Sequence, residues 1–332
     1  MFKVFAKTVV HVDYQTDRLH GGTLGDVQLI TGIAEFDDGN KHPYKIVLKT
    51  QKKWERYDDP DSWRREYDLY LSDLGGTFTD TFHLPACYHA EMNTGENEIK
   101  LWMEYIDGVS GLNLTGEMYK LAAEELGRFQ GRLHAEHPAL LHNLSNLSKV
   151  DYAKLFYQHY RSWEKVYDYI RSDDCELPKH ICKMLIDIDD NSDEVFNRIE
   201  KLPIVLCHRD FWVANIFYSD GNTVAIDWDT TGWGYLGEDI ASLIADEADV
   251  EHMIEYFNKC VPAYYKGFSE YVDISHITDN CIYELILVMF GYRLVEWYLD
   301  ASPENKIKET NDVKTLHLNT LQKIYELRDI NV

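Results

Sequence analysis

Three side chains in the second half of the chain have types and a spacing that could support acid–base and metal chemistry. Asp210 is followed after four residues by Asn215, and Asp227 ends a short apolar run. A loop carboxylate can accept or orient the proton of a hydroxyl group, whereas an amide oxygen and a second carboxylate are hard ligands for Mg²⁺. Phosphoryl transfer needs little more, because positioning and charge neutralisation carry most of its catalysis. We therefore expect Asp210 to be a catalytic base and Asn215 and Asp227 to be metal ligands.

The residues around this group allow more than one interpretation. His208 is expected to fix the loop through hydrogen bonds rather than to act as a base. Arg209 could contact a phosphate or form a salt bridge within the loop. Asp229 could support the metal ligands or contact a cationic substrate. Asp239 is expected to cap a helix or to bond to the backbone of the loop.

The first half of the chain offers groups that could hold phosphates. Lys49 ends an apolar strand-like run, where its ammonium group could point into a cleft, and Glu66 on a helical segment could pair with it. The glycines Gly21, Gly22 and Gly25 precede a strand, so their backbone N–H groups could approach phosphate oxygens. A plain hairpin turn is the alternative, since the spacing fits neither a Walker A loop nor a dinucleotide fingerprint. The order of glycines, strand lysine and helix glutamate favours a nucleotide site.

A short extended segment closes the β-rich part of the chain, and it consists of Met103, Glu104, Tyr105 and Ile106. Such a segment between two lobes offers backbone N–H and C=O groups to the edge of an adenine ring, and Met103 could line the ring pocket. An ordinary buried strand is the alternative. We expect these four residues to bind the nucleotide base.

The elements that would position these residues change in type along the chain. The first hundred residues are β-rich, with strands expected near 27–36, 44–49, 87–89 and 99–106. A helix is expected at 61–71 with Ser62 as its N-cap, because apolar residues recur there at intervals of three and four. A glycine-containing break at 107–111 then separates an N-terminal nucleotide-binding lobe, 1–106, from a C-terminal catalytic and substrate-binding lobe, 107–332. In the second lobe we expect helices near 116–136, 150–173 and 177–200, strands near 204–206 and 223–227, and a solvated acidic helix face at 187–194.

Composition excludes several classes of function. The 332 residues are 45% hydrophobic, which fits a folded globular protein. The net charge of −24 argues against a nucleic-acid partner and favours cationic ligands, although solubility alone could explain it. The six cysteines include no CxxC pair and no zinc spacing, so they read as reduced thiols. No apolar run of about 18 residues and no signal-peptide layout is present, so we expect no membrane partner and a cytoplasmic protein.

The order of these motifs resembles that of the aminoglycoside phosphotransferase-like family, small-molecule kinases related to choline kinase. The resemblance covers nearly the whole chain and is most specific at Asp210, Asn215 and Asp227. It implies an α+β, bilobal, protein-kinase-like fold with a small β-rich N-terminal lobe and a larger, mainly helical C-terminal lobe. It also implies a helical insertion at about 137–200, ATP and Mg²⁺ as cofactors, and a small-molecule hydroxyl as the phosphate acceptor. The family usually has Gly where this chain has Arg209, which is the protein-kinase residue.

The identity of the acceptor stays open. A cationic aminoglycoside-type antibiotic fits the acidic composition, with acidic residues of 246–255 as possible contacts. A metabolic acceptor such as choline, homoserine, another amino alcohol or a sugar fits as well. An aromatic box for a quaternary ammonium group could come from residues that could equally be core packing, and these are Trp233, Tyr264, Tyr265 and Trp297.

Two further alternatives rank lower. A protein kinase would need an activation segment, and the interval between Asp227 and Asp239 is too short for one. The long interval from Lys49 to Asp210 instead leaves room for the helical insertion of small-molecule kinases. A pseudokinase that only binds nucleotide is the third class, but every expected catalytic position is occupied. The oligomeric state cannot be predicted from the sequence.

Overall fold

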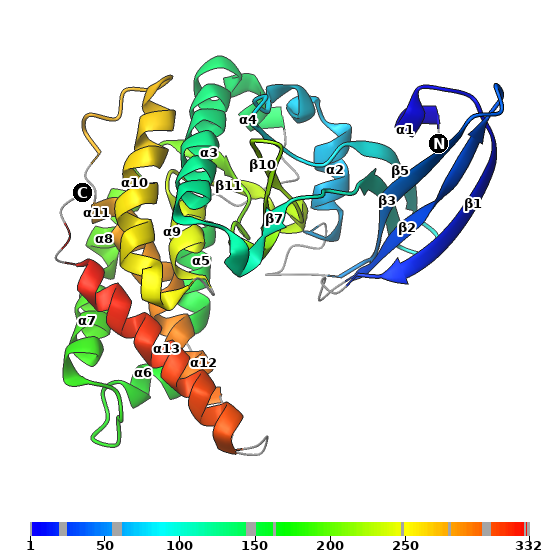
Figure 1. Ribbon diagram of the computed structural model, residues 1–332. Helices are drawn as coiled ribbons and strands as arrows, with labels where there is room; N and C mark the ends of the chain where they lie inside the picture. Colours follow the sequence, from blue (N-terminus) through cyan, green and yellow to red (C-terminus); the bar gives the residue numbers. More distant parts are fainter. Residues whose placement is uncertain are drawn as a thin grey trace.

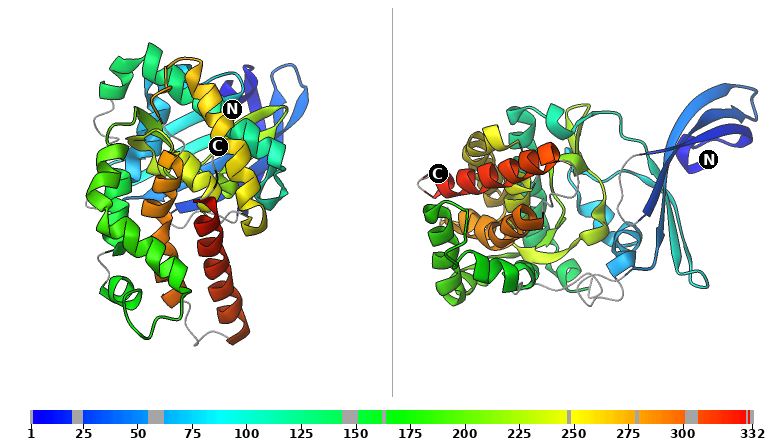
Figure 2. Two further views of the ribbon diagram at one scale, coloured as in Figure 1. Left: turned by 90° about the vertical axis from the view of Figure 1, so that its left-hand side faces the viewer. Right: turned by 90° about the horizontal axis from the view of Figure 1, so that it is seen from below.

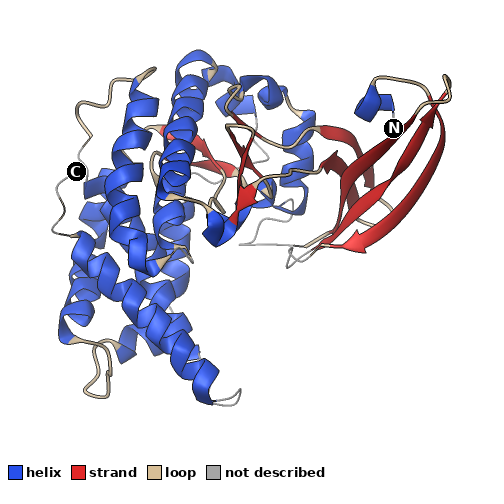
Figure 3. Ribbon diagram, in the orientation of Figure 1, coloured by secondary structure: helices blue, strands red, loops and turns tan. Residues whose placement is uncertain are grey.

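The computed structural model consists of a β-sheet part and a larger helical part (Figures 1 and 3). It describes residues 2–19, 25–54, 62–143, 151–161, 164–246, 249–277, 280–300, 307–328 and 330. Seen from below, the N-terminal sheet stands at one end of the molecule and the helices at the other (Figure 2). The α+β, bilobal fold with a β-rich N-terminal lobe and a helical C-terminal lobe is therefore confirmed.

The N-terminal lobe is an antiparallel sheet with the strand order β1-β2-β3-β6-β5. Its strands are β1 (Val9–Arg18), β2 (Gly25–Phe36), β3 (Lys41–Lys52), β5 (Cys87–Asn93) and β6 (Glu98–Glu104), and the short helix α1 (Phe2–Phe5) precedes them. Lys49 in β3 lies opposite Val27 in β2 and Leu101 in β6. Side chains alternate between the two faces of a strand, so this register places Val47, Lys49 and Gln51 on one face of the sheet.

Helix α2 (Arg65–Leu71) comes after β3 in the chain. It supplies Glu66, which bonds to Lys49 of the sheet. It is preceded by a 3-10 turn, Ser62–Arg64, and buried Trp63 packs there with Ile99 and Leu101 of β6. The expectation that Ser62 is the N-cap of the helix is wrong, because Ser62 is the first residue of the turn. The N-cap position of α2 is Arg64, which makes no side-chain cap bond.

Two small sheets carry the motif residues of the C-terminal lobe. The first has the order β4-β10-β9-β7 and the second pairs β11 with β8. Their strands are β4 (Phe82–His83), β7 (Val109–Ser110), β8 (Ile204–Cys207), β9 (Ile216–Ser219), β10 (Asn222–Ala225) and β11 (Gly232–Tyr235). Only β8 and β10 were expected, because their apolar runs are visible in the sequence, whereas strands of two to four residues generally leave little periodic signal.

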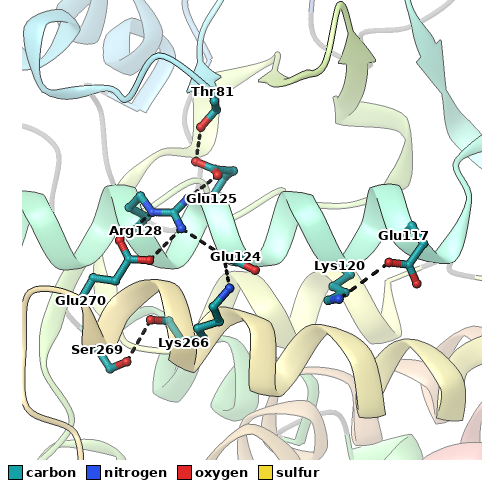
Figure 4. Close-up of polar contacts among 9 residues, drawn as sticks. All are labelled: Thr81, Glu117, Lys120, Glu124, Glu125, Arg128, Lys266, Ser269 and Glu270. Atoms are coloured by element: carbon teal, nitrogen blue, oxygen red, sulfur yellow. Dashed lines mark hydrogen bonds and ion pairs between the residues drawn. The ribbon is translucent and has the colours of Figure 1, made fainter.

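Helices α3 (Gly116–Glu136) and α10 (Met253–Ser269) cross closely at the centre of the helical lobe. The glycines make this approach possible: a Cβ at Gly127 would overlap the Tyr264 carbonyl oxygen, and one at Gly267 would overlap that of Glu124. Ion pairs flank the crossing (Figure 4), with Arg128 of α3 bonded to the Glu270 carboxylate at 2.7 and 2.8 Å. Helix α3 also packs against strands of both small sheets, β4 and β10 of the first and β8 of the second.

The remaining helices complete the lobe around one large hydrophobic core. They are α4 (Pro138–Asn143), α5 (Tyr152–Arg161), α6 (Glu164–Tyr169), α7 (Lys179–Asp190), α8 (Ser192–Ile199), α9 (Glu238–Ala245), α11 (Asn280–Ile286), α12 (Tyr292–Asp300) and α13 (Ile307–Leu327), with a π-helical turn at Leu287–Gly291. Among the described residues, no helix combines the length and apolarity that a bilayer crossing requires.

The acidic run 187–194 only partly forms a solvated face. Asp189 is buried and accepts hydrogen bonds from Tyr157 at 2.6 Å, Arg161 at 2.5 Å and Arg171 at 2.8 Å. The sequence pattern could not show this, because two arginines from other segments compensate the buried carboxylate.

Candidate active site

A cavity of about 640 Å³ lies between the N-terminal sheet and the small sheets of the C-terminal lobe. It collects residues from both halves of the chain. The expected site residues among its lining are Gly25, Lys49, Glu66, Met103, Glu104, Tyr105, Ile106, Asp210, Asn215, Asp227 and Asp229. Gly21 and Gly22 lie outside the described residues.

Lys49 stands at the centre of a buried charge cluster. Its Nζ lies 2.5 Å from Glu66 Oε2 and also donates to Asp227 Oδ1. Burial opposes the charge of Lys49, but Asp227 and Glu66 outweigh it and raise the pKa of the lysine well above its usual range. Burial raises the pKa of Glu66, with Lys49 acting in the opposite direction. Lys49 therefore stays protonated and links β3, α2 and the segment after β10.

The sheet and the segment after β6 line one end of the cavity with apolar groups. Gly25 belongs to this wall, and a Cβ there would lie 2.9 Å from the carbonyl oxygen of Thr50. The Glu104 N–H donates to the carbonyl of Ala86, the residue before β5, at 2.9 Å. Tyr105 packs against Lys45, whose Nζ lies 4.7 Å from the ring centre. This wall can hold a flat aromatic ring beside exposed backbone.

Asp210 and Asn215 lie together on the loop between β8 and β9. Asn215 Nδ2 donates to Asp210 Oδ2 at 2.7 Å and to the Asp210 carbonyl at 2.9 Å. These bonds fix the amide so that its Oδ1 is the atom that could bind a metal ion. Asp227 has a φ of 62°, a left-handed conformation that an Asp tolerates better than most residues. The turn directs its carboxylate toward Lys49 and the cavity.

His208 supports the loop and remains neutral. Its side chain is fully buried, with Nε2 2.8 Å from the Ile226 carbonyl and Nδ1 accepting from the Asp210 backbone at 3.3 Å. Burial lowers the pKa of His208 to about 4. A neutral ring that donates from Nε2 satisfies both bonds, so the structural role expected for this histidine agrees with its surroundings.

Asp239, at the start of α9, holds the loop backbone from behind. Its carboxylate accepts from the His208 N–H at 2.9 Å and from the Arg209 N–H at 2.8 Å. Gln130 of α3 donates to it at 3.0 Å. Burial raises the pKa of Asp239 to about 6, against the effect of these donors. The expectation that Asp239 bonds to the loop backbone is confirmed.

Arg209 and Asp229 occupy different surroundings. Asp229 lines the cavity and is one of the carboxylates that raise the pKa of Lys49. Arg209 points away from the cavity, and its guanidinium group donates to the Trp233 carbonyl.

Of the side chains considered as contacts for the acceptor, Trp233 and Tyr264 are core residues, and Asp246 lies 3.3 Å from Arg293.

Several lining residues were not predicted from the sequence. Val27 and Val47 belong to the N-terminal sheet, whereas Phe217 and Ile226 reach the cavity from the C-terminal lobe. Alternation along β3 away from Lys49 would have found Val47. Phe217 lies in β9, which forms a hairpin with β10, and the Asp220-Gly221 turn between them is the local signal that could have found it.

A family model now identifies the chain. The phosphotransferase enzyme family (APH) matches residues 58–263, more than half of the sequence. The chain belongs to the phosphotransferase enzyme family. The matched region contains α2 with Glu66, the segment after β6, and the loop with Asp210 and Asn215. No curated protein sequence matches the chain.

Solved structures with a similar fold agree with this assignment. One is aminoglycoside 2'-phosphotransferase-IIIa with GDP: TM-score 0.58, identity 15%, coverage 98% of this chain and 95% of that one. Another is choline kinase from Cryptosporidium parvum Iowa II: TM-score 0.53, identity 16%, coverage 95% and 90%. A third is amicoumacin kinase with AMP-PNP and Ca²⁺: TM-score 0.51, identity 15%, coverage 94% and 88%.

Proposed function

We propose that this phosphotransferase moves the γ-phosphoryl group of ATP to a hydroxyl group of a small molecule, with Mg²⁺ as the metal. One observation carries the proposal: the Lys49–Glu66–Asp227 cluster and the Asp210–Asn215 pair line the same cavity. Lys49 would neutralise phosphate charge, and Glu66 would hold Lys49 in place. Asp210 would accept or orient the proton of the acceptor hydroxyl.

The donor atoms of the site suit Mg²⁺. Asn215 Oδ1 and the Asp227 carboxylate are hard oxygen ligands, and Mg²⁺ takes one or two such protein ligands beside substrate phosphates. Among the described residues no set of three or more acidic, His or Cys side chains could hold a metal, so phosphates would have to complete the coordination. When bound, the ion would neutralise charge on the phosphates.

The base of the nucleotide would lie against the wall formed by Met103, Glu104, Tyr105 and Ile106, beside Gly25. The apolar residues on either side, Val47 and Phe217 among them, suit an adenine ring.

We also propose a lobe boundary at 106/107 and a helical insertion at about 137–200. Within it the structure has α4, α5, α6, α7 and α8.

Two features suggest the acceptor: the net charge of the chain and the names of structurally similar proteins. A net charge of −24 favours a cationic acceptor such as an aminoglycoside-type antibiotic. The second candidate is a metabolic amino alcohol such as choline, which a structurally similar protein is named for. The six free cysteines suit a cytoplasmic location.

Replacing the proposed base tests the reaction. Asp210→Ala should abolish phosphoryl transfer and leave nucleotide binding largely intact, because Asp210 makes no bond to Lys49 or Glu66. Asp220→Ala is a matched control, since Asp220 lies in the turn between β9 and β10 with a φ of 51°. Unchanged turnover in the Asp210 variant would overturn the proposed role.

A panel of acceptors separates the two candidates. The purified protein should be assayed for ATP consumption with aminoglycosides, choline, ethanolamine, homoserine and simple sugars. Turnover of an aminoglycoside, with resistance in an expressing host, supports the first candidate, whereas turnover of choline or ethanolamine alone supports the second. ATP consumption with none of them, at Mg²⁺ saturation, would count against both.

A further inference from the structure

Arg209 directly precedes the proposed base, Asp210, so it can influence the position of that side chain. Arg209 itself does not line the cavity. It is 5% exposed and has a φ of 65°, in the left-handed region that side chains other than Gly rarely adopt. An arginine at such a position is unfavourable on backbone grounds alone. Its side-chain contacts must therefore compensate for the conformation.

Those contacts join three separate elements. The guanidinium group donates to the Trp233 carbonyl of β11, and its carbon lies 4.5 Å from the ring centre of Tyr152 in α5. Arginine stacks on aromatic rings through its planar, delocalised charge. The loop that carries Asp210 is thus tied both to its neighbouring sheet and to a helix of the insertion.

A buried carboxyl group lies near enough to the guanidinium group to interact with its charge, without a direct ion pair between the two. Glu238 of α9 is 1% exposed and accepts from the Tyr235 N–H at 2.9 Å, while its attraction to Arg209 favours the charged arginine. Gly234 makes room for this carboxylate, because a Cβ there would overlap Glu238 Oε2. Because burial raises the pKa of Glu238 to about 8, the bond to Trp233 and the contact with Tyr152 hold Arg209 at neutral pH, and Glu238 adds attraction only as it ionises.

We propose that Arg209 is a positioning residue for Asp210: its side chain holds the loop against β11 and Tyr152. The proposal rests on the proposed phosphotransferase function. This role takes the place of the phosphate contact, one of the two alternatives that the sequence left open for Arg209. The helix α5 then contributes to the placement of the proposed base.

Three substitutions separate backbone conformation from side-chain contact. Arg209→Gly relieves the left-handed backbone, Arg209→Met keeps apolar bulk, and Arg209→Lys keeps the charge without the planar group. We expect Gly and Met to lower kcat by at least about tenfold with little change in the KM for MgATP, and Lys to recover part of kcat. Arg171→Met is the matched control, because Arg171 stacks 3.8 Å over Tyr167 outside the cavity; its kcat should stay near the wild-type value.

The kinetic constants of these variants decide whether Arg209 positions Asp210. Wild-type kcat in Arg209→Gly would overturn the proposal, since the side chain would then be dispensable. A rise in the KM for MgATP at constant kcat would assign Arg209 to nucleotide binding instead. Thermal unfolding and MgATP binding of each variant exclude misfolding as the cause. If the wild-type protein itself transfers no phosphoryl group, the proposed function fails rather than this role.

A separate observation concerns two cysteines far along the insertion. Cys175 Sγ lies 3.4 Å from Cys182 Sγ, and both side chains are half-buried. Cys182 is in the first turn of α7, whereas Cys175 belongs to the preceding loop, held by a Glu176 N–H bond to Tyr169 at 2.9 Å. Burial and the contact with Cys175 raise the pKa of Cys182 to about 12.

We infer that Cys175 and Cys182 form a thiol–disulfide exchange site for small-molecule disulfides. The Cys175 thiolate attacks one sulfur of the reagent and releases the first thiol, which leaves a mixed disulfide. Cys182 then loses its proton, attacks the Cys175 sulfur and releases the second thiol. Two protein thiols are oxidised and one small-molecule disulfide is reduced to two thiols.

Oxidised glutathione is the probe for this site. After incubation of the folded protein, denaturation and alkylation, mass spectrometry should find a Cys175–Cys182 disulfide. Cys182→Ser should accumulate glutathione on Cys175, and Cys175→Ser should leave Cys182 unmodified. Cys87→Ser is the control and should behave like the wild type. Full alkylation of both cysteines in the wild type, or glutathione on Cys182 in the Cys175 variant, would overturn the inference.

Discussion

Glu66→Gln should separate catalysis from stability, because Lys49 has two close carboxylate partners. The substitution removes the charge-assisted bond of 2.5 Å but keeps the shape of the side chain and leaves Asp227 paired with the lysine. A hydrogen bond between charged groups contributes about 1.5–3 kcal/mol. We therefore expect kcat/KM for MgATP to fall roughly 10- to 150-fold.

The same variant should unfold at nearly the wild-type urea concentration. Lys49 retains a counter-charge, so we expect the free energy of unfolding to change by less than about 2 kcal/mol. Lys49→Ala should cost about 3–5 kcal/mol instead, because it leaves the buried Glu66 and the partly exposed Asp227 without a cation. Steady-state kinetics and urea unfolding of both variants measure the two quantities.

Glu125→Gln supplies the control. Glu125 is 5% exposed on α3 and bonds to Thr81 and Arg128 away from the cavity (Figure 4). Its loss should lower stability without a tenfold change in kcat/KM. If Glu66→Gln destabilises as strongly as Lys49→Ala, or leaves kcat/KM unchanged, Glu66 does not act by positioning Lys49.

Four further outcomes are expected. Because the pKa of His208 falls to about 4, the stability that its neutral ring confers is present above about pH 6.5 and lost as pH falls through 4. The His208→Gln variant has no group to protonate there, so its free energy of unfolding, measured with urea, should fall by about 3 kcal/mol less on acidification than that of the wild type. Burial raises the pKa of Glu238 to about 8, so the stability that its protonated form confers is lost as pH rises from about 4.5 through 8. Glu238→Gln should therefore unfold later than wild type by a margin that grows over this range and is constant above about pH 8. Gly127→Ala should lose about 1–3 kcal/mol in chemical unfolding, because its Cβ would overlap the Tyr264 carbonyl. Mg²⁺ should raise the melting temperature, and Asp227→Asn should abolish that rise if the carboxylate is a ligand.

Much of the fold could be predicted because its signals are local. The long helix Gly116–Glu136 and the strand Gly25–Phe36 show periodicity in their own residues. β1 was not expected, because its residues are largely exposed and polar. The strands β7 and β11 pair with β9 and β8, which are distant in sequence. The expected helix 150–173 contains α5 and α6, and residues 162–163 between them lie outside the described part of the chain.

The candidate site divides in the same way. Asp210, Asn215, Asp227, Lys49 and Glu66 could be named from type and spacing, and the structure brings them to one cavity. Their roles remain predictions until tested. The burial of Arg209 could not be foreseen, because its partners Trp233 and Tyr152 come from elements whose packing the sequence does not encode locally.

The charge around Lys49 has a consequence for the order in which ligands arrive. Of the described side chains that line the cavity, Glu66, Glu104, Asp210, Asp227 and Asp229 are acidic, and Lys49 is the one Lys or Arg. A free nucleotide triphosphate would meet a surplus of like charge there. If the proposed reaction holds, a divalent ion would be needed for the nucleotide to enter the cavity as well as for the transfer. The protein would then discriminate strongly between ATP and its magnesium complex at the first encounter.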